Sequence, residues 1–210
     1  ITYSKGGAVL SMFEAFLGRD AFRAGVREHM RRHAWKTATA YDFIDALASQ
    51  STEHAPEAVA TAFRSFIEQA GLPMLEVQLQ CDADGARAHL SQSRYLPLGS
   101  SGDQSRTWTL PVCLDYRHGD SNTVQCFLMS EAEIEVGLGG NTCPDLLMPN
   151  AEGTGYYRWN LDSEGWRKLL SASDQLEVDE LMSVAASLDG AFNAGTIDVT
   201  TYMQVARRRS

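Results

Sequence analysis

The sequence predicts an α+β chain with more than one domain, in which helices come first, an antiparallel β-sandwich follows and helices return at the end. Three observations carry this prediction. Apolar residues recur at helical spacing over residues 4–70, alternate with polar residues over 74–161, and return to helical spacing after Ser163. The chain has 210 residues, of which 44% are hydrophobic and 21% charged, so it can bury a core and is not a disordered chain.

The first region is expected to hold four helices. Gly18 separates the first from the second, which runs to about His33. Thr39 and Asp42 have the spacing of a capping box, and Pro56 suits the first turn of the fourth helix. Gly71 is expected to cap that helix at its C-terminus. The apolar stripes of the first, second and fourth helices are Val9, Met12, Phe13, Phe16 and Leu17; Phe22, Val26 and Met30; and Val59, Phe63, Phe66 and Ile67.

From residue 74 onward the apolar period changes to two, which is the period of a half-buried strand. Seven or so short strands with turns between them indicate a small antiparallel sandwich. Asp84-Gly85 and His118-Gly119-Asp120 are turn signals, and 99–102 reads as a flexible loop. The alternating segments are 75–81, 86–90, 108–116, 124–128, 132–136 and 157–161.

After Ser163 the pattern is helical again. Residues 178–188 form an amphipathic stripe, and 200–206 begin a further helix. These helices have few partners within the chain, so they are expected to begin a larger helical domain.

Charge supports the same division of the chain. Residues 1–71 hold eight basic and eight acidic side chains, whereas residues 72–163 hold five basic and twelve acidic ones. The domains are therefore expected at 1–71, 72–163 and 164–210. The net charge of −9 argues against a nucleic-acid binder, and no apolar run is long enough for a membrane span. A soluble protein is expected.

The four cysteines are Cys81, Cys113, Cys126 and Cys143, and none lies in a C-x-x-C pair. Cys81 falls on the apolar phase of its strand, which favours a buried free thiol. A disulfide stays open as an alternative. The compartment stays open as well, between the cytoplasm and a periplasmic or secreted location.

Five motifs carry a resemblance along nearly the whole chain. They are Y-S-K-G at 3–6, R-R-H-A-W-K-T-A-T-A-Y-D-F at 31–43, Q-A-G-L-P at 69–73, W-T-L-P-V at 108–112 and G-Y-Y-R-W-N-L-D at 155–162. In this order they resemble the aminopeptidase N family of zinc metallopeptidases. The resemblance implies that the chain is an internal fragment of a four-domain aminopeptidase that acts on peptides.

By this resemblance, residues 1–71 are the helical end of a thermolysin-like zinc domain. Residues 72–163 are the small β-sandwich, and residues from 164 begin a C-terminal helical superhelix. The family binds zinc through H-E-x-x-H and a later glutamate, and this sequence contains no such motif. Zinc is therefore expected in the parent protein, with no ligand in this fragment, and the fragment alone is expected to be inactive.

Tyr3 is the one catalytic residue that the resemblance implies. In the family, the tyrosine of this motif hydrogen bonds to the oxyanion that forms when zinc-activated water adds to the peptide carbonyl. A phenol suits this role because it stays protonated at neutral pH. Lys5 and Gly6 are expected to be structural, with Lys5 at the surface where the helix begins and Gly6 allowing close helix packing.

Other candidates receive structural interpretations. His29 and His33 share a helix face, but two arginines between them disfavour a cation site. Asp42 and Asp45 are expected on a solvated face, and 137–140 is glycine-rich without the strand–helix context of a phosphate loop. The tryptophans Trp35, Trp108, Trp159 and Trp166 are expected in or near the core. The alternative is that the parent protein is a catalytically inactive relative of the family, or that the sandwich and helices form a module that binds a partner.

Overall fold

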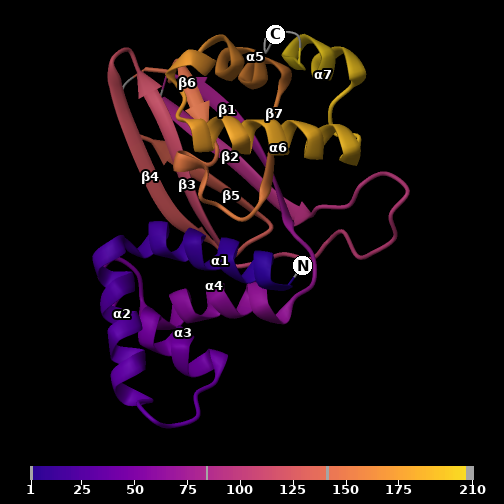
Figure 1. Ribbon diagram of the computed structural model, residues 1–210. Helices are drawn as coiled ribbons and strands as arrows, with labels where there is room; N and C mark the ends of the chain where they lie inside the picture. The colour runs from indigo at the N-terminus through magenta and orange to yellow at the C-terminus, as the bar shows by residue number, and fades with distance from the viewer. Residues whose placement is uncertain (1, 84, 141, 207–210) are drawn as a thin grey trace.

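The computed structural model describes residues 2–83, 85–140 and 142–206. Its elements, in chain order, are α1 (Thr2–Leu17), α2 (Arg19–Arg32), α3 (Ala40–Ala48), α4 (Pro56–Glu68), β1 (Pro73–Asp82), β2 (Gly85–Arg94), β3 (Leu110–His118), β4 (Ser121–Met129), β5 (Glu133–Leu138), β6 (Leu146–Met148), the 3-10 turn Ala151–Gly153, β7 (Arg158–Leu161), α5 (Ser163–Ser171), the 3-10 turn Ser173–Gln175, α6 (Val178–Ala194) and α7 (Val199–Ala206). Helices α1–α4 lie at one end of the molecule and α5–α7 at the other, with the strands between (Figure 1). The α+β fold class is confirmed.

The helical end is built from the apolar stripes that the sequence shows. Phe13 of α1 stacks on Phe63 of α4, with ring centroids 3.4 Å apart, and meets Phe66 edge to face. Thr39 caps α3, because its hydroxyl accepts from the Asp42 N–H while the Asp42 carboxylate accepts from the Thr39 N–H. This capping box and the Pro56 start of α4 are confirmed.

The predicted end of α4 is wrong by two residues. The helix stops at Glu68, and Gln69 already has an extended backbone, so Gly71 is not its C-cap. The Gln69 side chain donates to the carbonyl of Thr107, 3.1 Å away, on the segment that leads into β3. Gln69 makes this long-range bond from an extended backbone conformation. Gly71, between α4 and β1, has a backbone φ of 115°.

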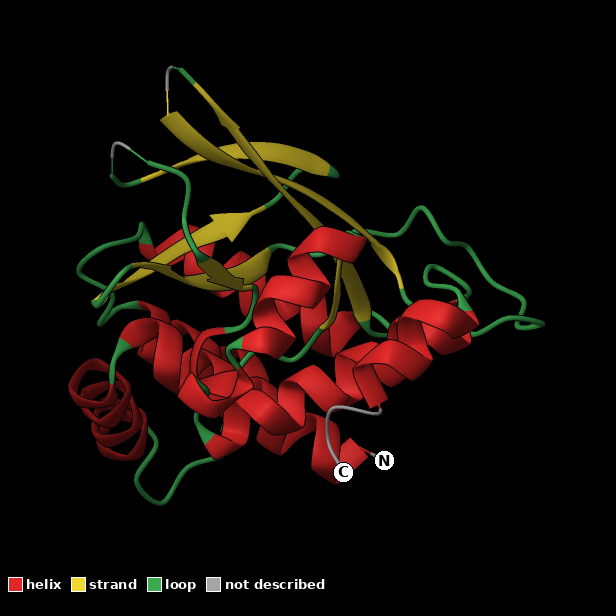
Figure 2. Ribbon diagram, turned by 90° about the horizontal axis from the view of Figure 1, so that it is seen from above, coloured by secondary structure: helices red, strands yellow, loops and turns green. Residues whose placement is uncertain are grey.

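Two sheets form the sandwich, one with the order β5-β2-β1-β7 and the other with the order β4-β3-β6. Figure 2 shows the strands gathered on one side of the molecule and most helices on the other. The predicted sandwich is antiparallel throughout, and this is wrong at one place: β7 pairs parallel to β1, with Leu75 opposite Trp159. Asp84 of the predicted hairpin turn lies outside the described residues, and the flanking strands pair from Asp82 and Gly85.

The core runs without interruption from the helical end through the sandwich to the C-terminal helices. Three of the tryptophans are buried, as predicted: Trp108, Trp159 and Trp166. Trp35 is fully exposed in the turn after α2, so its predicted place in the core is wrong. Its backbone has φ 62°, a left-handed conformation that is rare for a bulky residue.

A buried amide connects the two sheets. Gln92 of β2 is 5% exposed, and its side chain accepts from the Trp108 N–H and donates to the carbonyls of Trp108 and Glu131. Buried polar groups are stable only when they are paired, and here one side chain satisfies the backbone of two segments.

The cysteines form two disulfides, Cys81–Cys143 and Cys113–Cys126. The predicted buried free thiol at Cys81 is therefore wrong. Alternation does place Cys81 on the same face of the strand as Leu75 and Val77. The last residues of β1 are not covered by other parts of the chain, however, and so Cys81 is exposed. There it meets Cys143 of the segment between β5 and β6.

The C-terminal helices cover one part of the sandwich. Val184, Leu188 and Ala191 of α6 are buried, whereas Val178 and Met182 on the same helix are exposed. Within the described part of the chain, no helix has the length and apolar character required to cross a membrane.

Candidate active site

Tyr3 lies in the first turn of α1, close to the junction between the helical region and the sandwich. Its side chain is 96% exposed. Among the described residues, none donates to or accepts from its hydroxyl. The phenol is therefore free to donate a hydrogen bond to a group that approaches the start of α1.

The start of α1 is fixed to the rest of the chain by Lys5. Its ammonium donates to the carbonyl of Gln69, 2.8 Å away, just after the end of α4. Partial burial lowers the pKa of Lys5 from its usual value. Since the Gln69 side chain bonds to Thr107, two hydrogen bonds connect the turn that carries Tyr3 to the entrance of β3. Lys5 is thus a partly exposed residue at the start of the helix that also tethers α1 to the end of α4.

Gly6 does not allow close helix packing, so that prediction is wrong. A Cβ at this position would find no atom within 4 Å. Gly6 instead lines an open apolar groove of about 300 Å³ between α1, α3 and α4, next to the turn that carries Tyr3. The groove is lined by Lys5, Gly6, Val9, Leu10, Ala40, Phe43, Ile44, Phe63, Phe66 and Ile67.

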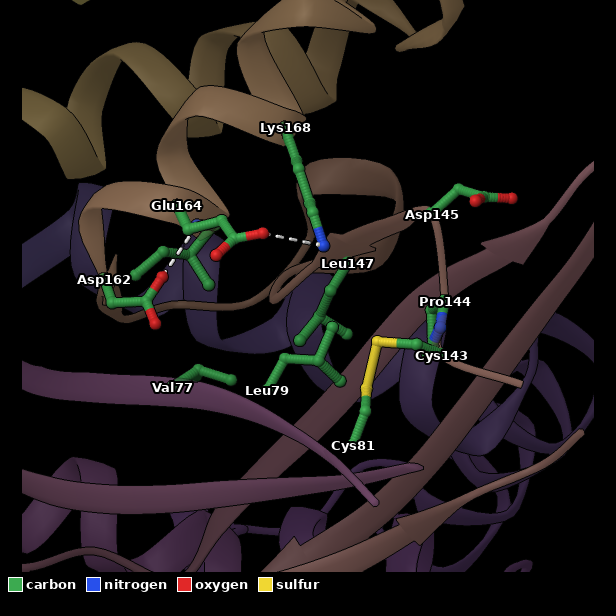
Figure 3. A pocket seen from close by; sticks show the side chains of 12 residues that line it. Val77, Leu79, Cys81, Cys143, Pro144, Asp145, Leu147, Asp162, Glu164 and Lys168 are labelled. Carbon is green, nitrogen blue, oxygen red and sulfur yellow. Dashed lines mark hydrogen bonds and ion pairs between the residues drawn. A yellow bond between two sulfur atoms is a disulfide. The ribbon is translucent and has the colours of Figure 1, made fainter. Parts of the chain in front are cut away.

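A second cavity, of about 220 Å³, opens between β1, the segment before β6 and the start of α5 (Figure 3). Its polar side chains are already paired. Lys168 bonds to Glu164 at 3.2 Å, and the Asp162 carboxylate accepts from the Gly165 N–H at 2.7 Å as the cap of α5. These polar groups are therefore used to hold the start of α5 in place.

The described residues do not fit a zinc ion. Nowhere in the described ranges do three or more His, Cys, Asp or Glu side chains come together as a metal site would require. His29 and His33 lie with their ring centroids 5.0 Å apart, and His29 also packs edge to face on Phe43. His29 packs on α2, and His33 lies at the C-cap of that helix.

The sequence analysis missed two features of this region, the Lys5–Gln69 bond and the row of arginines on α2. The Lys5–Gln69 bond joins residues 64 positions apart, and no local pattern identifies a backbone carbonyl as its acceptor. The arginines of α2 do leave a signal, because Arg19, Arg23, Arg27 and Arg31 repeat every four residues.

Comparison with known proteins gives matches along nearly the whole chain. Residues 1–66 match the Peptidase family M1 domain. The chain is 24% identical over 208 residues to puromycin-sensitive aminopeptidase of Caenorhabditis elegans, covering 98% of this chain and 22% of that protein. It is 30% identical over 190 residues to probable M1 family aminopeptidase 1 of Encephalitozoon cuniculi, covering 90% and 20%.

A third relative is aminopeptidase A of Gloydius brevicauda, which is 29% identical over 223 residues, with 97% of this chain and 22% of the relative covered. The chain thus spans about a fifth of the length of the curated relatives that it matches. These findings confirm the resemblance carried by the five motifs: the chain is related to the aminopeptidases of peptidase family M1.

Proposed function

We propose that this chain is part of a zinc aminopeptidase that removes N-terminal residues from peptides, and that Tyr3 is one of its catalytic residues. The observation that carries the proposal is the match of residues 1–66 to the Peptidase family M1 domain, a segment that contains the exposed Tyr3. The proposal is also supported by relatives that match nearly the full chain and are named aminopeptidases.

The role of Tyr3 follows from the charge that develops in peptide hydrolysis. When a nucleophile adds to the scissile carbonyl, its oxygen becomes an oxyanion, and a positioned hydrogen-bond donor stabilises the transition state more than the ground state. The Tyr3 hydroxyl is a neutral donor, and the Lys5–Gln69 bond holds its helix turn in place. Zinc is proposed for the full-length protein, and the described residues contribute no ligand set to it. The 210-residue chain alone is therefore proposed to be inactive.

The test is Tyr3→Phe in the full-length protein, assayed on an aminoacyl-p-nitroanilide. We expect kcat to fall about 100- to 1,000-fold, since this is the effect of losing one oxyanion donor, with a small change in KM. Tyr41→Phe is the matched control, because it removes another exposed hydroxyl from the helical region. A Tyr3→Phe enzyme with the parent kcat would remove Tyr3 from the mechanism.

The domain limits belong to the same proposal. We propose that residues 1–71 end the peptidase domain, residues 72–163 form a separate sandwich, and residues from 164 begin a helical domain. Expression of residues 72–163 alone tests this, since a separate sandwich should fold and form both disulfides.

We also propose that the protein matures in an oxidising compartment, periplasmic or extracellular. The support is the presence of two disulfides, which reducing conditions in the cytosol disfavour. Alkylation of the native protein before mass spectrometry tests it. We expect no labelled cysteine without a reductant, and labelling of all four would contradict the proposal.

A further inference from the structure

Helix α2 carries a row of arginines on its outer face. Arg19, Arg23, Arg27 and Arg31 are all exposed, and their four-residue spacing places them one above another. Like charges at this spacing repel and destabilise a helix. An anionic surface brought against this face would relieve that repulsion.

Only part of this charge is neutralised within the chain. Arg31 shares Glu28 with Arg32, and Arg19 lies 3.8 Å from Glu14. Within the ranges that the structure describes, neither Arg23 nor Arg27 forms an ion pair. The middle of the row is therefore open to an external anion.

The opposite face of α2 is fixed against the core, so the row cannot turn inward. Gly25 lies so close to α3 that a Cβ there would come within 2.7 Å of the Leu47 Cα. Phe22 and Val26 pack against the core on the same side. The arginine face is consequently held outward.

Two apolar side chains accompany the arginines. Met30, three residues after Arg27, is 67% exposed, and Trp35 in the turn after α2 is fully exposed. Trp35 also keeps its left-handed backbone conformation. Such conformations cost free energy and cluster at binding sites. We call Arg19, Arg23, Arg27 and Arg31, with Met30 and Trp35, the basic face.

The charge distribution within this chain would turn this face toward an anionic surface. Residues 19–36 hold six basic and two acidic side chains, whereas residues 72–163 hold five basic and twelve acidic ones. Figure 1 shows α2 beyond α1, away from the sheets. An asymmetric charge distribution of this kind orients a protein as it approaches a charged partner.

We propose that the basic face docks the protein on an anionic phospholipid membrane. The arginines would bind headgroup phosphates, and Met30 and Trp35 would enter the boundary between headgroups and acyl chains. Tryptophan favours that boundary because its ring has both apolar and polar parts. A soluble polyanion would engage the arginines and leave Met30 and Trp35 without a role, so the exposed apolar pair favours a lipid surface.

The first experiment is flotation of the protein with vesicles of phosphatidylcholine, with and without phosphatidylglycerol. We expect binding to the anionic vesicles alone, weakened by salt. Arg23→Gln and Arg27→Gln should each lower the partition coefficient about fivefold. Arg167→Gln is the matched control, because it removes one exposed helical arginine from the opposite end of the molecule and should change nothing.

The second experiment follows tryptophan fluorescence of the 210-residue chain. Trp108, Trp159 and Trp166 are at most 2% exposed, so a change of emission on binding reports Trp35. We expect a blue shift and protection from acrylamide with anionic vesicles, and neither in Trp35→Phe. Binding to heparin without binding to vesicles would overturn the proposal, as would vesicle binding that leaves the Trp35 emission unchanged.

Discussion

The helical region (residues 1–71) and the sandwich (residues 72–163) are stabilised in different ways. The helical region contains no cysteine, and apolar packing around Phe13 and Phe63 holds it together. The sandwich contains two disulfides and a buried amide, Gln92, that satisfies the backbone of two segments. It also carries most of the excess negative charge.

This difference suggests that the sandwich supports the structure, whereas the helical region carries the proposed functional surfaces. Both proposed functional surfaces, the turn of Tyr3 and the basic face of α2, belong to the helical region that lacks cross-links. In the sandwich, by contrast, the buried side chain of Gln92 is used to hold the sandwich itself. A cross-linked unit next to a helical layer gives that layer a fixed base, and the Lys5–Gln69–Thr107 bonds connect the two.

The largest expected effect concerns the packing of the helical region. Phe63→Ala should lower the free energy of unfolding by about 3–5 kcal/mol, because it leaves a cavity against Phe13 that the helices cannot fill. Urea unfolding followed by circular dichroism measures this. Leu98→Ala, at a side chain that is 75% exposed, is the control and should change stability little. A small loss for Phe63→Ala would show that this stack is not what holds the helices.

The free energy of unfolding that each disulfide contributes should increase with the number of residues between its two cysteines. Cys81→Ala/Cys143→Ala removes a cross-link between residues 62 positions apart, which is expected to cost about 4 kcal/mol. Cys113→Ala/Cys126→Ala removes one between residues 13 apart, at an expected cost of about 3 kcal/mol. Denaturant unfolding of both pairs under oxidising conditions tests the order. A reversed order would mean that the shorter link stabilises the native sandwich directly.

A smaller effect is expected where the two regions meet. Lys5→Met keeps the length of the side chain and removes the bond to the Gln69 carbonyl, which should cost about 1 kcal/mol. Lys5→Arg can still donate and should keep most of the stability. Thermal unfolding compares the variants. If Lys5→Met and Lys5→Arg behave alike, the bond does not join the regions in solution.

The smallest effect is a pH dependence within the sandwich. Burial raises the pKa of Glu76, although a hydrogen bond from Asn160 opposes the shift. The folded state therefore holds this proton more tightly, and the associated stability is present at low pH and lost as the pH rises through the raised pKa. Glu76→Gln should raise Tm more at about pH 7 than at about pH 4. An equal change at the two values would contradict the raised pKa.

Local patterns predicted most of the elements and less of their long-range arrangement. Alternation located six of the seven described strands, and the Thr39–Asp42 spacing located a helix start, because both depend on neighbouring residues. Alternation missed β6, whose three residues are all buried and therefore do not alternate. Alternation shows which residues share a face, but not where the opposite sheet ends, and so Cys81 was misplaced. Trp35 was misplaced for a related reason: its size favours burial, while the turn that carries it leaves it fully exposed among the described residues.

The candidate site shows the same limit. Tyr3 was found through a motif, whereas its tether through Lys5 depends on a carbonyl 64 positions away. The parallel pairing of β7 with β1 likewise joins distant segments, and no short stretch of sequence encodes it.

The Cys81–Cys143 bond has a consequence for a chain that a protease has cut. The loop between β2 and β3, which includes the exposed Leu98, lies between the two bonded cysteines. A protease that cuts this loop once breaks the backbone but releases nothing, because both pieces stay covalently joined. The nicked protein would migrate as one band until a reductant separates it into two.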